Sequence, residues 1–270
     1  MSPSPSKERL GIQSIEVGAR LLKALTNNGK PMMLRDLAHA ANMPAAKAHR
    51  YLVSFSRTGL VEQDQVSGRY GLGTFALDLG LASLARLDSV RLAGPIIEDL
   101  CEKISKTIGL AVWGTHGATI VRLAEPGGLI TVTLRAGTVF PLANSATGRA
   151  FAAFLNSGHL KQLLEESLKE SAEAAGVSLA SQRREYEKTL EETRHYGIAR
   201  ASGSLTPGIN GFSAPVFDHG GKMVATITAL GSVGMFDDDW HGAIAQPIKE
   251  AAHLLSRQLG FQSENTPIAS

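Results

Sequence analysis

Three side chains able to donate hydrogen bonds follow a proline in the first fifth of the chain. Lys47, His49 and Arg50 come soon after Pro44. Ammonium and guanidinium groups pair with phosphate oxygens, and a guanidinium can also bridge the two acceptors on the edge of a guanine. Together these residues indicate contact with a nucleic acid. We favour a phosphate over guanine as the partner of Arg50. For His49 a contact to the DNA backbone and a plain position on the helix surface both stay open.

The residues around these side chains predict two short helices joined by a tight turn. Apolar residues recur at i, i+3, i+4 and i+7 over 34–41, and Asn42-Met43-Pro44 then interrupts the pattern. Pro44 suits the first position of a second helix, where its missing N–H costs nothing. In such a pair the second helix enters the major groove of DNA. Its outer side carries the residues expected to meet a duplex: Ala45, Ala46, Lys47, His49 and Arg50.

An extended pair of segments, 60–62 and 69–72, follows this second helix. A polar turn that ends in Ser67-Gly68 joins them, as a β-hairpin requires. Such a hairpin beside a helix-turn-helix forms a wing. Arg69 is then expected to contact a phosphate or the minor groove, and the alternative is a solvated turn residue.

The distribution of charge favours DNA binding over a helix pair that merely packs. Residues 1–72 hold ten Lys and Arg against five Asp and Glu, whereas the remaining chain holds 17 against 20. A basic segment joined to a mildly acidic one is typical of a module that binds the phosphates of double-stranded DNA.

The length and composition of the chain are typical of a globular protein with two domains. The chain has 270 residues, of which 19% are charged. No apolar run reaches the roughly 18–20 residues of a membrane span, so we expect no membrane association and a cytoplasmic protein. Cys101 is the only cysteine, which rules out an intrachain disulfide. It falls in a helical pattern, where a small buried side chain is expected.

Helical and strand patterns alternate after the wing and predict an α+β domain with an antiparallel sheet. Residues 73–87 form a helical segment so apolar that we expect it to pack against a second copy of the chain. A first helix is predicted at 14–27, with Ser14 as its N-cap and Ile15 on its inward side. The segments that follow the wing have the periodicity of helices at 89–107, 144–155, 159–170, 181–195 and 238–259. The run 237–239 supplies favourable negative charge at the start of the last helix, and Pro247 is a candidate for a kink in it. Strand patterns occupy 109–114, 118–124, 129–134, 197–201, 210–218 and 223–231.

Four motifs in this order and spacing resemble the isocitrate lyase regulator (IclR) family of bacterial transcription factors. They are GRYGLG at 68–73, PLANSATGRA at 141–150, PGINGFSAPVFD at 207–218 and ALG at 229–231. The resemblance covers about residues 12–262. It implies a DNA-binding protein that acts as a homodimer or homotetramer on palindromic operators and responds to a small-molecule effector.

The resemblance also implies the domain limits. A disordered N-terminus, 1–11, precedes a winged helix-turn-helix domain, 12–73. A linker helix, 74–88, leads to a GAF-like effector-binding domain, 89–262, and to a disordered tail, 263–270.

Carried over to this sequence, the family's effector pocket involves seven positions: Leu134, Ala146, Thr147, Ile209, Gly211, Thr228 and Leu230. The chain departs from the members that bind small keto acids at three places. Ala201 stands where they have an acidic residue, Gly211 where they have a cysteine, and Leu230 where they have a serine.

Each of these departures removes a polar group or enlarges the space. Because a buried carboxylate needs donors, we expect a larger and more apolar effector, such as an aromatic acid. Its charged end would meet backbone N–H groups at residues 145–147 and the hydroxyl of Thr228. The helix after Pro44, here called the reader helix, also departs from the family pattern, since Ala45-Ala46-Lys47 replaces a Lys-Ser-Thr-like trio. The resemblance favours a DNA contact for His49.

Two alternatives stay open. A DNA-binding regulator without an effector would use residues 89–270 only for self-association. An enzyme is the least favoured, because the chain shows no metal-binding spacing among its eight histidines, no G-x-S-x-G elbow and no phosphate-binding glycine loop. We therefore expect no catalytic residues, no metal and no cofactor.

Overall fold

An apolar cluster around Leu21, Leu37 and Leu52 forms the core of the first of two units, Met1–Leu87 and Asp88–Ser270. The computed structural model describes residues 11–84, 88–127 and 134–262. The first unit consists of α1 (Gln13–Asn28), α2 (Leu34–Ala40), α3 (Ala45–Arg57), β1 (Val61–Gln63), β2 (Tyr70–Leu72) and α4 (Thr74–Leu84). This order confirms the predicted helix-turn-helix.

The orientation of α1 differs from the prediction, which placed Ile15 inward and Ser14 as the N-cap. Ile15 is 66% exposed, and Ser14 lies inside the helix. Gly18 explains the difference, because a Cβ there would lie 2.8 Å from Cζ of Phe55 on α3. The absence of a side chain at this position lets α1 approach α3 along a face that also buries Leu21.

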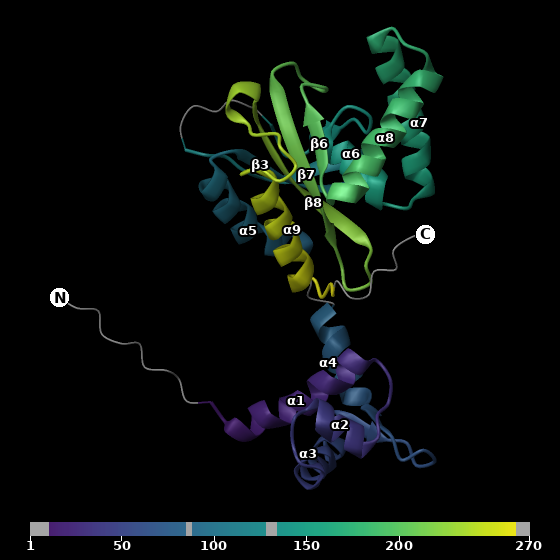
Figure 1. Ribbon diagram of the computed structural model, residues 1–270, viewed down its shortest axis with the longest axis vertical. Helices are drawn as coiled ribbons and strands as arrows, with labels where there is room; N and C mark the ends of the chain where they lie inside the picture. The colour runs from purple at the N-terminus through teal and green to yellow at the C-terminus, as the bar shows by residue number, and fades with distance from the viewer. Residues whose placement is uncertain (1–10, 85–87, 128–133, 263–270) are drawn as a thin grey trace, which may run out of the picture. The chain divides into compact units, whose positions relative to one another are not determined.

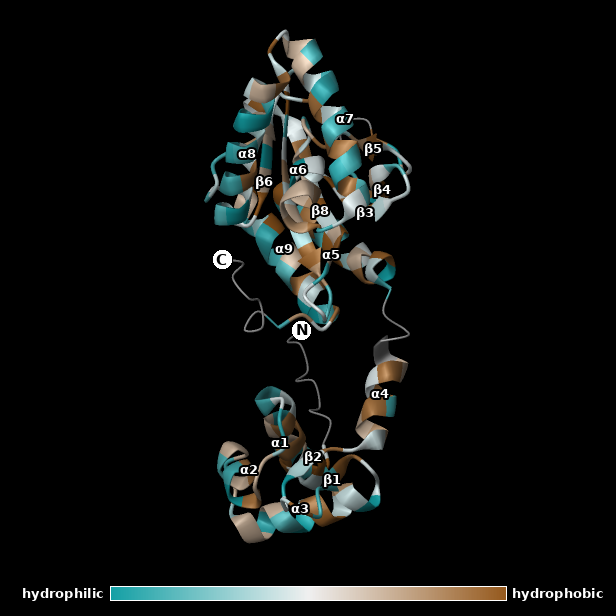
Figure 2. Cartoon of the chain, turned by 90° about the vertical axis from the view of Figure 1, so that its right-hand side faces the viewer, coloured by the Kyte–Doolittle hydropathy of each residue, from teal (hydrophilic) through white to brown (hydrophobic). Residues whose placement is uncertain are grey.

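Helix α4 presents an apolar surface along its length (Figure 2). The exposed side chains are Phe75, Leu77, Leu79 and Leu81, with exposed fractions of 43–61%. The predicted linker continues to residue 88, but 85–87 lie outside the described residues.

The second unit is an α+β domain. Its helices are α5 (Ser89–Ile104), α6 (Ala146–Phe154), α7 (Gly158–Ala175), α8 (Leu179–Tyr196), the 3-10 helix η1 (Val233–Met235) and α9 (Ala245–Gln258). Its strands are β3 (Thr107–Gly114), β4 (Gly117–Ala124), β5 (Val139–Phe140), β6 (Ala199–Ser202), β7 (Ile209–Phe217) and β8 (Met223–Ser232).

These strands form one antiparallel sheet in the order β5-β4-β3-β8-β7-β6, as predicted for the fold class. Helices α5 and α9 lie side by side on one face, and α6 packs on the other, beside the α7–α8 hairpin (Figure 1). The short strand β5 has no counterpart in the sequence prediction, because two residues carry no periodic signal.

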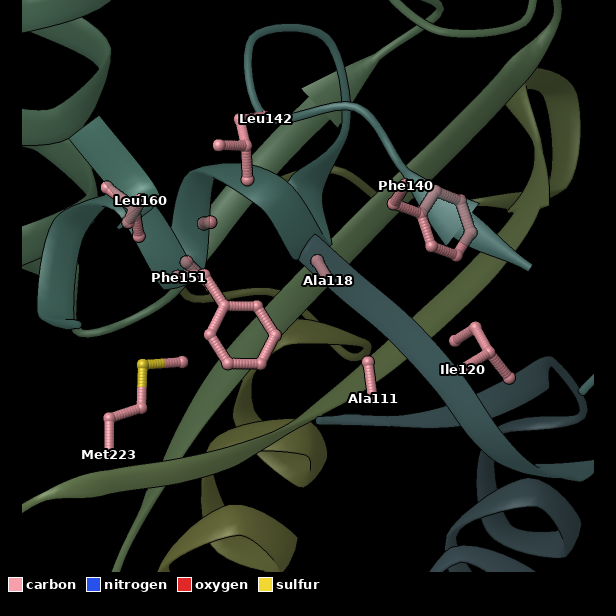
Figure 3. Packing of buried hydrophobic residues seen from close by; sticks show 10 residues of the cluster. Ala111, Ala118, Ile120, Phe140, Leu142, Phe151, Leu160 and Met223 are labelled. Atoms are coloured by element: carbon pink, nitrogen blue, oxygen red, sulfur yellow. The ribbon is translucent and has the colours of Figure 1, made fainter. Parts of the chain in front are cut away.

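The core under α6 contains two phenylalanine rings, Phe140 and Phe151, among aliphatic side chains (Figure 3). Phe151 is fully buried, and its ring centroid lies 5.5 Å from that of Trp113. Ala111 and Ala118, on neighbouring strands, belong to the same cluster and leave room for the ring. This packing holds α6 close to the sheet.

The last predicted helix starts later than expected. The prediction began at residue 238, with the run of Asp237 to Asp239 at its N-terminus, but α9 starts at Ala245. The carboxylate of Asp237 instead accepts hydrogen bonds from the backbone N–H groups of Asp239, at 3.2 Å, and Ala243, at 2.9 Å. Pro247, predicted as a possible kink, lies in the first turn of α9, where a proline is tolerated.

Three further predictions fall at the edge of the described residues. Of the strand predicted at 129–134, only Leu134 is described, and it lies outside any strand. The predicted disordered ends, 1–11 and 263–270, are outside the description apart from Gly11.

In the described part of the chain, no helix combines the length and apolar character needed to cross a membrane.

Candidate functional site

Helix α3 turns its basic side chains outward. Ala48 and Leu52 are fully buried against the core of the first unit. All five residues predicted for the reader helix are exposed: Ala45, Ala46, Lys47, His49 and Arg50. Tyr51 and Ser54, which the sequence reasoning missed, line a shallow hollow together with Lys47 and Arg50. Their place one turn after Lys47 and Arg50 is the signal that could have identified them.

The turn between α2 and α3 fixes the position of the reader helix. Asn42 adopts a φ of 50°, a left-handed conformation that asparagine tolerates better than most residues. The backbone N–H of Met43 donates to the carbonyl of Ala38 at 3.0 Å and closes the turn. Pro44 is the N-cap of α3, one residue before the position predicted for it.

The wing is a hairpin of β1 and β2, paired from Val61↔Leu72 to Gln63↔Tyr70. One carboxylate organises its turn. Asp64 accepts hydrogen bonds from the backbone N–H of Val66 at 3.2 Å and from the N–H and hydroxyl of Ser67 at 2.6 and 2.7 Å.

These bonds to Ser67, followed by the bond to Val66, lower the pKa of Asp64. Arg69 is exposed at the end of this turn, and its Nη1 donates to the carbonyl of Pro31 at 3.4 Å.

A cavity of about 320 Å³ lies in the second unit, between the start of α6 and the ends of β6, β7 and β8. Six of the seven residues predicted for an effector line it: Leu134, Ala146, Thr147, Ile209, Gly211 and Leu230. Two further wall residues, Ser145 and Ala201, enter the sequence analysis through the expected N–H groups at 145–147 and the departure at 201. The remaining wall residues have no counterpart in the prediction: Phe140, Leu205, Thr206, Pro207 and Asn210.

Thr228, the seventh predicted residue, does not line this cavity. It is fully buried beneath α6. Its Oγ1 lies 2.9 Å from Oγ1 of Thr147 and 2.8 Å from Oγ of Ser213, in a chain of three hydroxyls. The expectation that this hydroxyl would hold an effector is therefore corrected. Its bonds connect the start of α6 to the middle of the sheet.

The start of α6 offers unused hydrogen-bond donors to the cavity. Ser145 is the N-cap, and its side chain accepts from the N–H of Gly148 at 2.8 Å. The N–H groups of Ala146 and Thr147 have no hydrogen-bond partner among the described residues. The first turn of a helix also carries a partial positive charge. This end of the cavity is thus suited to an anionic group.

The three positions at which the chain departs from keto-acid binders form a single row across the sheet. Ala201 on β6 pairs with Gly211 on β7, and Gly211 pairs with Leu230 on β8. A Cβ at Gly211 would lie 2.7 Å from Cδ2 of Leu230. The side chain of Leu230 therefore occupies the space that Gly211 leaves, so the leucine at 230 removes a polar group without enlarging the cavity.

The segment before α6 is held by side chains from three other parts of the domain. The hydroxyl of Tyr186 on α8 donates to the carbonyl of Leu142 at 2.9 Å, and burial raises the pKa of that phenol. Nε of Arg149 donates to the carbonyl of Ala143 at 3.0 Å, and the hydroxyl of Ser204 donates to the carbonyl of Asn144 at 2.8 Å.

The geometry offers binding rather than catalysis. The hydroxyl of Ser145 donates to the carbonyl of Pro141 at 2.7 Å, so it is engaged in structure. Burial raises the pKa of the Cys101 thiol, which disfavours the reactive thiolate. Within residues 11–84, 88–127 and 134–262, no group of three or more His, Cys, Asp or Glu side chains is placed to hold a metal ion.

We expect Asp64→Asn to loosen the wing, because an amide is a weaker acceptor than a carboxylate for the bonds to Val66 and Ser67. Amide hydrogen exchange at these two residues should become faster, while exchange in α3 stays unchanged. Since the pKa of Asp64 is lowered, the same loosening should appear in the wild type only below pH 3.8, as the carboxylate is protonated.

The matched control is Glu62→Gln. Glu62 is an exposed carboxylate on β1 that accepts no hydrogen bond from the described residues of the turn, so its replacement should leave the exchange rates as they are. Equal rates in Asp64→Asn and the wild type would show that the carboxylate does not organise the turn.

Two family models match the chain. The model described as "IclR helix-turn-helix domain" matches residues 14–65, and "Bacterial transcriptional regulator IclR C-terminal" matches residues 81–257.

Among curated relatives, the transcriptional repressor IclR of Escherichia coli K12 is 26% identical over 84% of this chain and 83% of its own length. The glycerol operon regulatory protein of Streptomyces coelicolor is also 26% identical, over 92% of this chain and 97% of its own length.

Solved structures show the same architecture. HmgR of Pseudomonas aeruginosa is 35% identical, with a TM-score of 0.85 over 93% of this chain and 100% of that chain. The repressor BlcR of Agobacterium tumefaciens has a TM-score of 0.76 over 93% of this chain and 99% of that chain, and its 21% identity indicates the fold alone.

Proposed function

Because this chain belongs to the IclR family of bacterial transcriptional regulators, we propose that it binds a pseudo-palindromic operator as a dimer or tetramer and that a small acid with an aromatic or otherwise apolar body controls this binding. Its relatives are named regulators and repressors, so the chain is a regulator and not an enzyme. We place its action in the cytoplasm, with 12–73 as the DNA-binding domain, 74–88 as the linker and 89–262 as the effector-binding domain.

The DNA contacts in this proposal come from α3 and the wing. Ala45 and Ala46 lack hydrogen-bonding side chains, so they can only touch a thymine methyl or allow close approach. Lys47, His49 and Arg50 supply the polar contacts of the reader helix. Arg69 supplies a phosphate or minor-groove contact from the wing.

We expect Arg50→Ala to weaken operator binding by about 1–3 kcal/mol, because one charged contact to DNA is lost. The measurement is a gel-shift titration at fixed salt, with duplexes that the wild-type protein selects from a random pool. Arg183→Ala removes the same charge from the second unit, where Arg183 pairs with Glu165, and should bind as the wild type does. Unchanged binding by Arg50→Ala would exclude Arg50 from the interface.

Self-association through the first unit follows from its exposed apolar side chains. Leu77 is 61% exposed and Leu81 54% exposed on α4. Apolar side chains repeated along one helix are costly to leave in water and favour contact with a second copy of the chain. Two joined copies would present two reader helices to the half-sites of one operator.

The double change Leu77→Glu and Leu81→Glu should therefore lower the mass of the assembly in sedimentation velocity, because the charges oppose burial of α4. Val177→Glu changes a residue that is also partly exposed, at the α7–α8 turn, and serves as the control. An assembly of wild-type mass in the double variant would remove α4 from the interface.

One observation carries the choice of ligand class: an apolar wall faces an end of the cavity that carries free N–H groups. Leu134, Ile209 and Leu230 line the cavity together with Ala146 and Thr147, whose N–H groups lack partners among the described residues. The carboxylate of an aromatic acid would accept hydrogen bonds from α6, and its ring would pack on the leucine and isoleucine side chains.

In a thermal-shift screen of the full-length protein, 2-naphthoate and phenylacetate should raise the Tm, whereas glyoxylate and pyruvate should not. Saturation at 100 times the Kd adds about 2.7 kcal/mol of stability. A shift with the keto acids alone would contradict the apolar ligand class. No shift with any acid would favour the regulator without an effector.

Gly211→Leu tests the position of the ligand, because the new side chain fills the cavity against Leu230. It should abolish the shift with the aromatic acids and leave operator binding intact. If Gly211→Leu fails to fold, Gly211→Leu combined with Leu230→Gly exchanges the two side chains across β7 and β8 and keeps their summed volume. If calorimetry showed undiminished binding of 2-naphthoate to Gly211→Leu, the ligand would have to bind outside this cavity.

A further inference from the structure

A second hollow, of about 250 Å³, lies on the α8 side of α6 and shares no lining residue with the cavity described above. Arg149 of α6 and Arg200 of β6 line it, together with hydroxyl residues and Trp240. The hydroxyl residues are Thr189, Ser202 and Ser204.

Arg149 uses only part of its guanidinium for the fold. Nε donates to the carbonyl of Ala143 at 3.0 Å, and Nη1 donates to the carbonyl of Arg200 at 2.6 Å. No described residue accepts a hydrogen bond from its Nη2. Burial is the main cause that lowers the pKa of this group. Tyr186 and Glu192 act in the opposite direction, and the charge of Arg200 lowers the pKa further.

Arg200 reaches the same hollow from the sheet. Its Nη1 donates to the backbone carbonyl of Asp238 at 3.0 Å, and its Cζ lies 4.3 Å from the centre of the Trp240 ring. The ring of Tyr196 stacks on Trp240 with centroids 4.5 Å apart, and the centroid of the Phe212 ring lies 5.8 Å from that of Trp240. This packing fixes the guanidinium of Arg200 in the wall of the hollow.

The described residues place no carboxylate within ion-pair distance of either arginine. Neither Arg149 nor Arg200 forms a salt bridge with a described side chain. Glu192 lines the hollow but is exposed, and the carboxylate of Asp238 accepts from the hydroxyl of Ser202 at 2.9 Å. Two cationic groups therefore face one hollow with donors to spare, and the exposed carboxylate of Glu192 supplies one negative charge against them. Such an arrangement is costly unless an anion joins it.

We propose that Arg149 and Arg200 form an anion site for a compact oxyanion of the phosphate type, separate from the cavity of the aromatic acid. A phosphate group carries the charge and the several acceptor oxygens that two guanidinium groups match. The size of the hollow admits inorganic phosphate or the phosphate of a small ester, and both offer the same chemistry to the arginines.

The test is a calorimetric titration of the full-length protein with sodium phosphate, at constant ionic strength in chloride. We expect saturable binding to the wild type and at least tenfold weaker binding to Arg200→Gln, whose side chain contributes only one hydrogen bond to the fold. A parallel titration with phenyl phosphate separates the sources. Binding of both ligands indicates a phosphate ester or free phosphate, and binding of phosphate alone indicates the free ion.

Arg183→Gln, which removes an equal charge from the α7–α8 hairpin, is the control and should bind phosphate as the wild type does. Arg149→Lys keeps the charge but loses the planar fork, so it should fold and bind more weakly. No saturable binding to the wild type, or equal affinity in Arg200→Gln, overturns the proposal. Neither outcome depends on operator DNA or on an aromatic acid, so the proposed regulatory function is tested separately.

Discussion

The conformation of the five residues before α6 is the constraint on which the second unit depends. Carbonyl groups in this segment accept hydrogen bonds from Tyr186 on α8, from Arg149 on α6 and from Ser204 on the β6–β7 connection. Buried backbone groups are costly to leave unpaired, so each of these side chains specifies where the segment runs. Gly148 allows the close approach, since a Cβ there would collide with the carbonyl oxygen of Pro141.

The same constraint makes the start of α6 responsive to what lies beside it. The Thr147 hydroxyl is bonded to Thr228, which is bonded to Ser213 in the middle of the sheet. A ligand that accepted a hydrogen bond from the N–H of Thr147 would therefore act on a helix end that is hydrogen-bonded to the sheet. If the contact between Thr147 and Thr228 has two alternative arrangements, the binding of a ligand to one of them would change the conformation of the domain.

Local periodicity was sufficient to predict the parts of the structure that depend on neighbours in sequence. The inward side of α3, with Ala48 and Leu52, follows from helical spacing alone. Ile15 was placed wrongly because the packing of Gly18 against Phe55, a contact distant in sequence, decides which face of α1 is buried. The start of α9 was predicted too early for a related reason. A carboxylate such as that of Asp237 can accept hydrogen bonds within a turn as readily as it can stabilise the start of a helix.

The cavity shows the same division between local and distant information. Family resemblance identified six of its lining residues, and five of them lie in the motifs at 141–150, 207–218 and 229–231, whose spacing is fixed. It missed Leu205 and Thr206, which precede the motif at 207–218 and lie in the connection after β6, where the sequence has no periodicity. Thr228 was assigned to the cavity, but the strand places its hydroxyl under α6 instead.

The row Ala201–Gly211–Leu230 shows how the cavity can change its chemistry without losing its packing. Relative to the keto-acid pattern of cysteine and serine, Gly211 gives up volume on β7 and Leu230 takes it up on β8, at the position directly opposite. The packing of the two strands is thus kept, while two polar side chains are lost. Since the apolar wall offers no donor to the keto oxygen of a compact keto acid, polarity more than size would disfavour such a ligand.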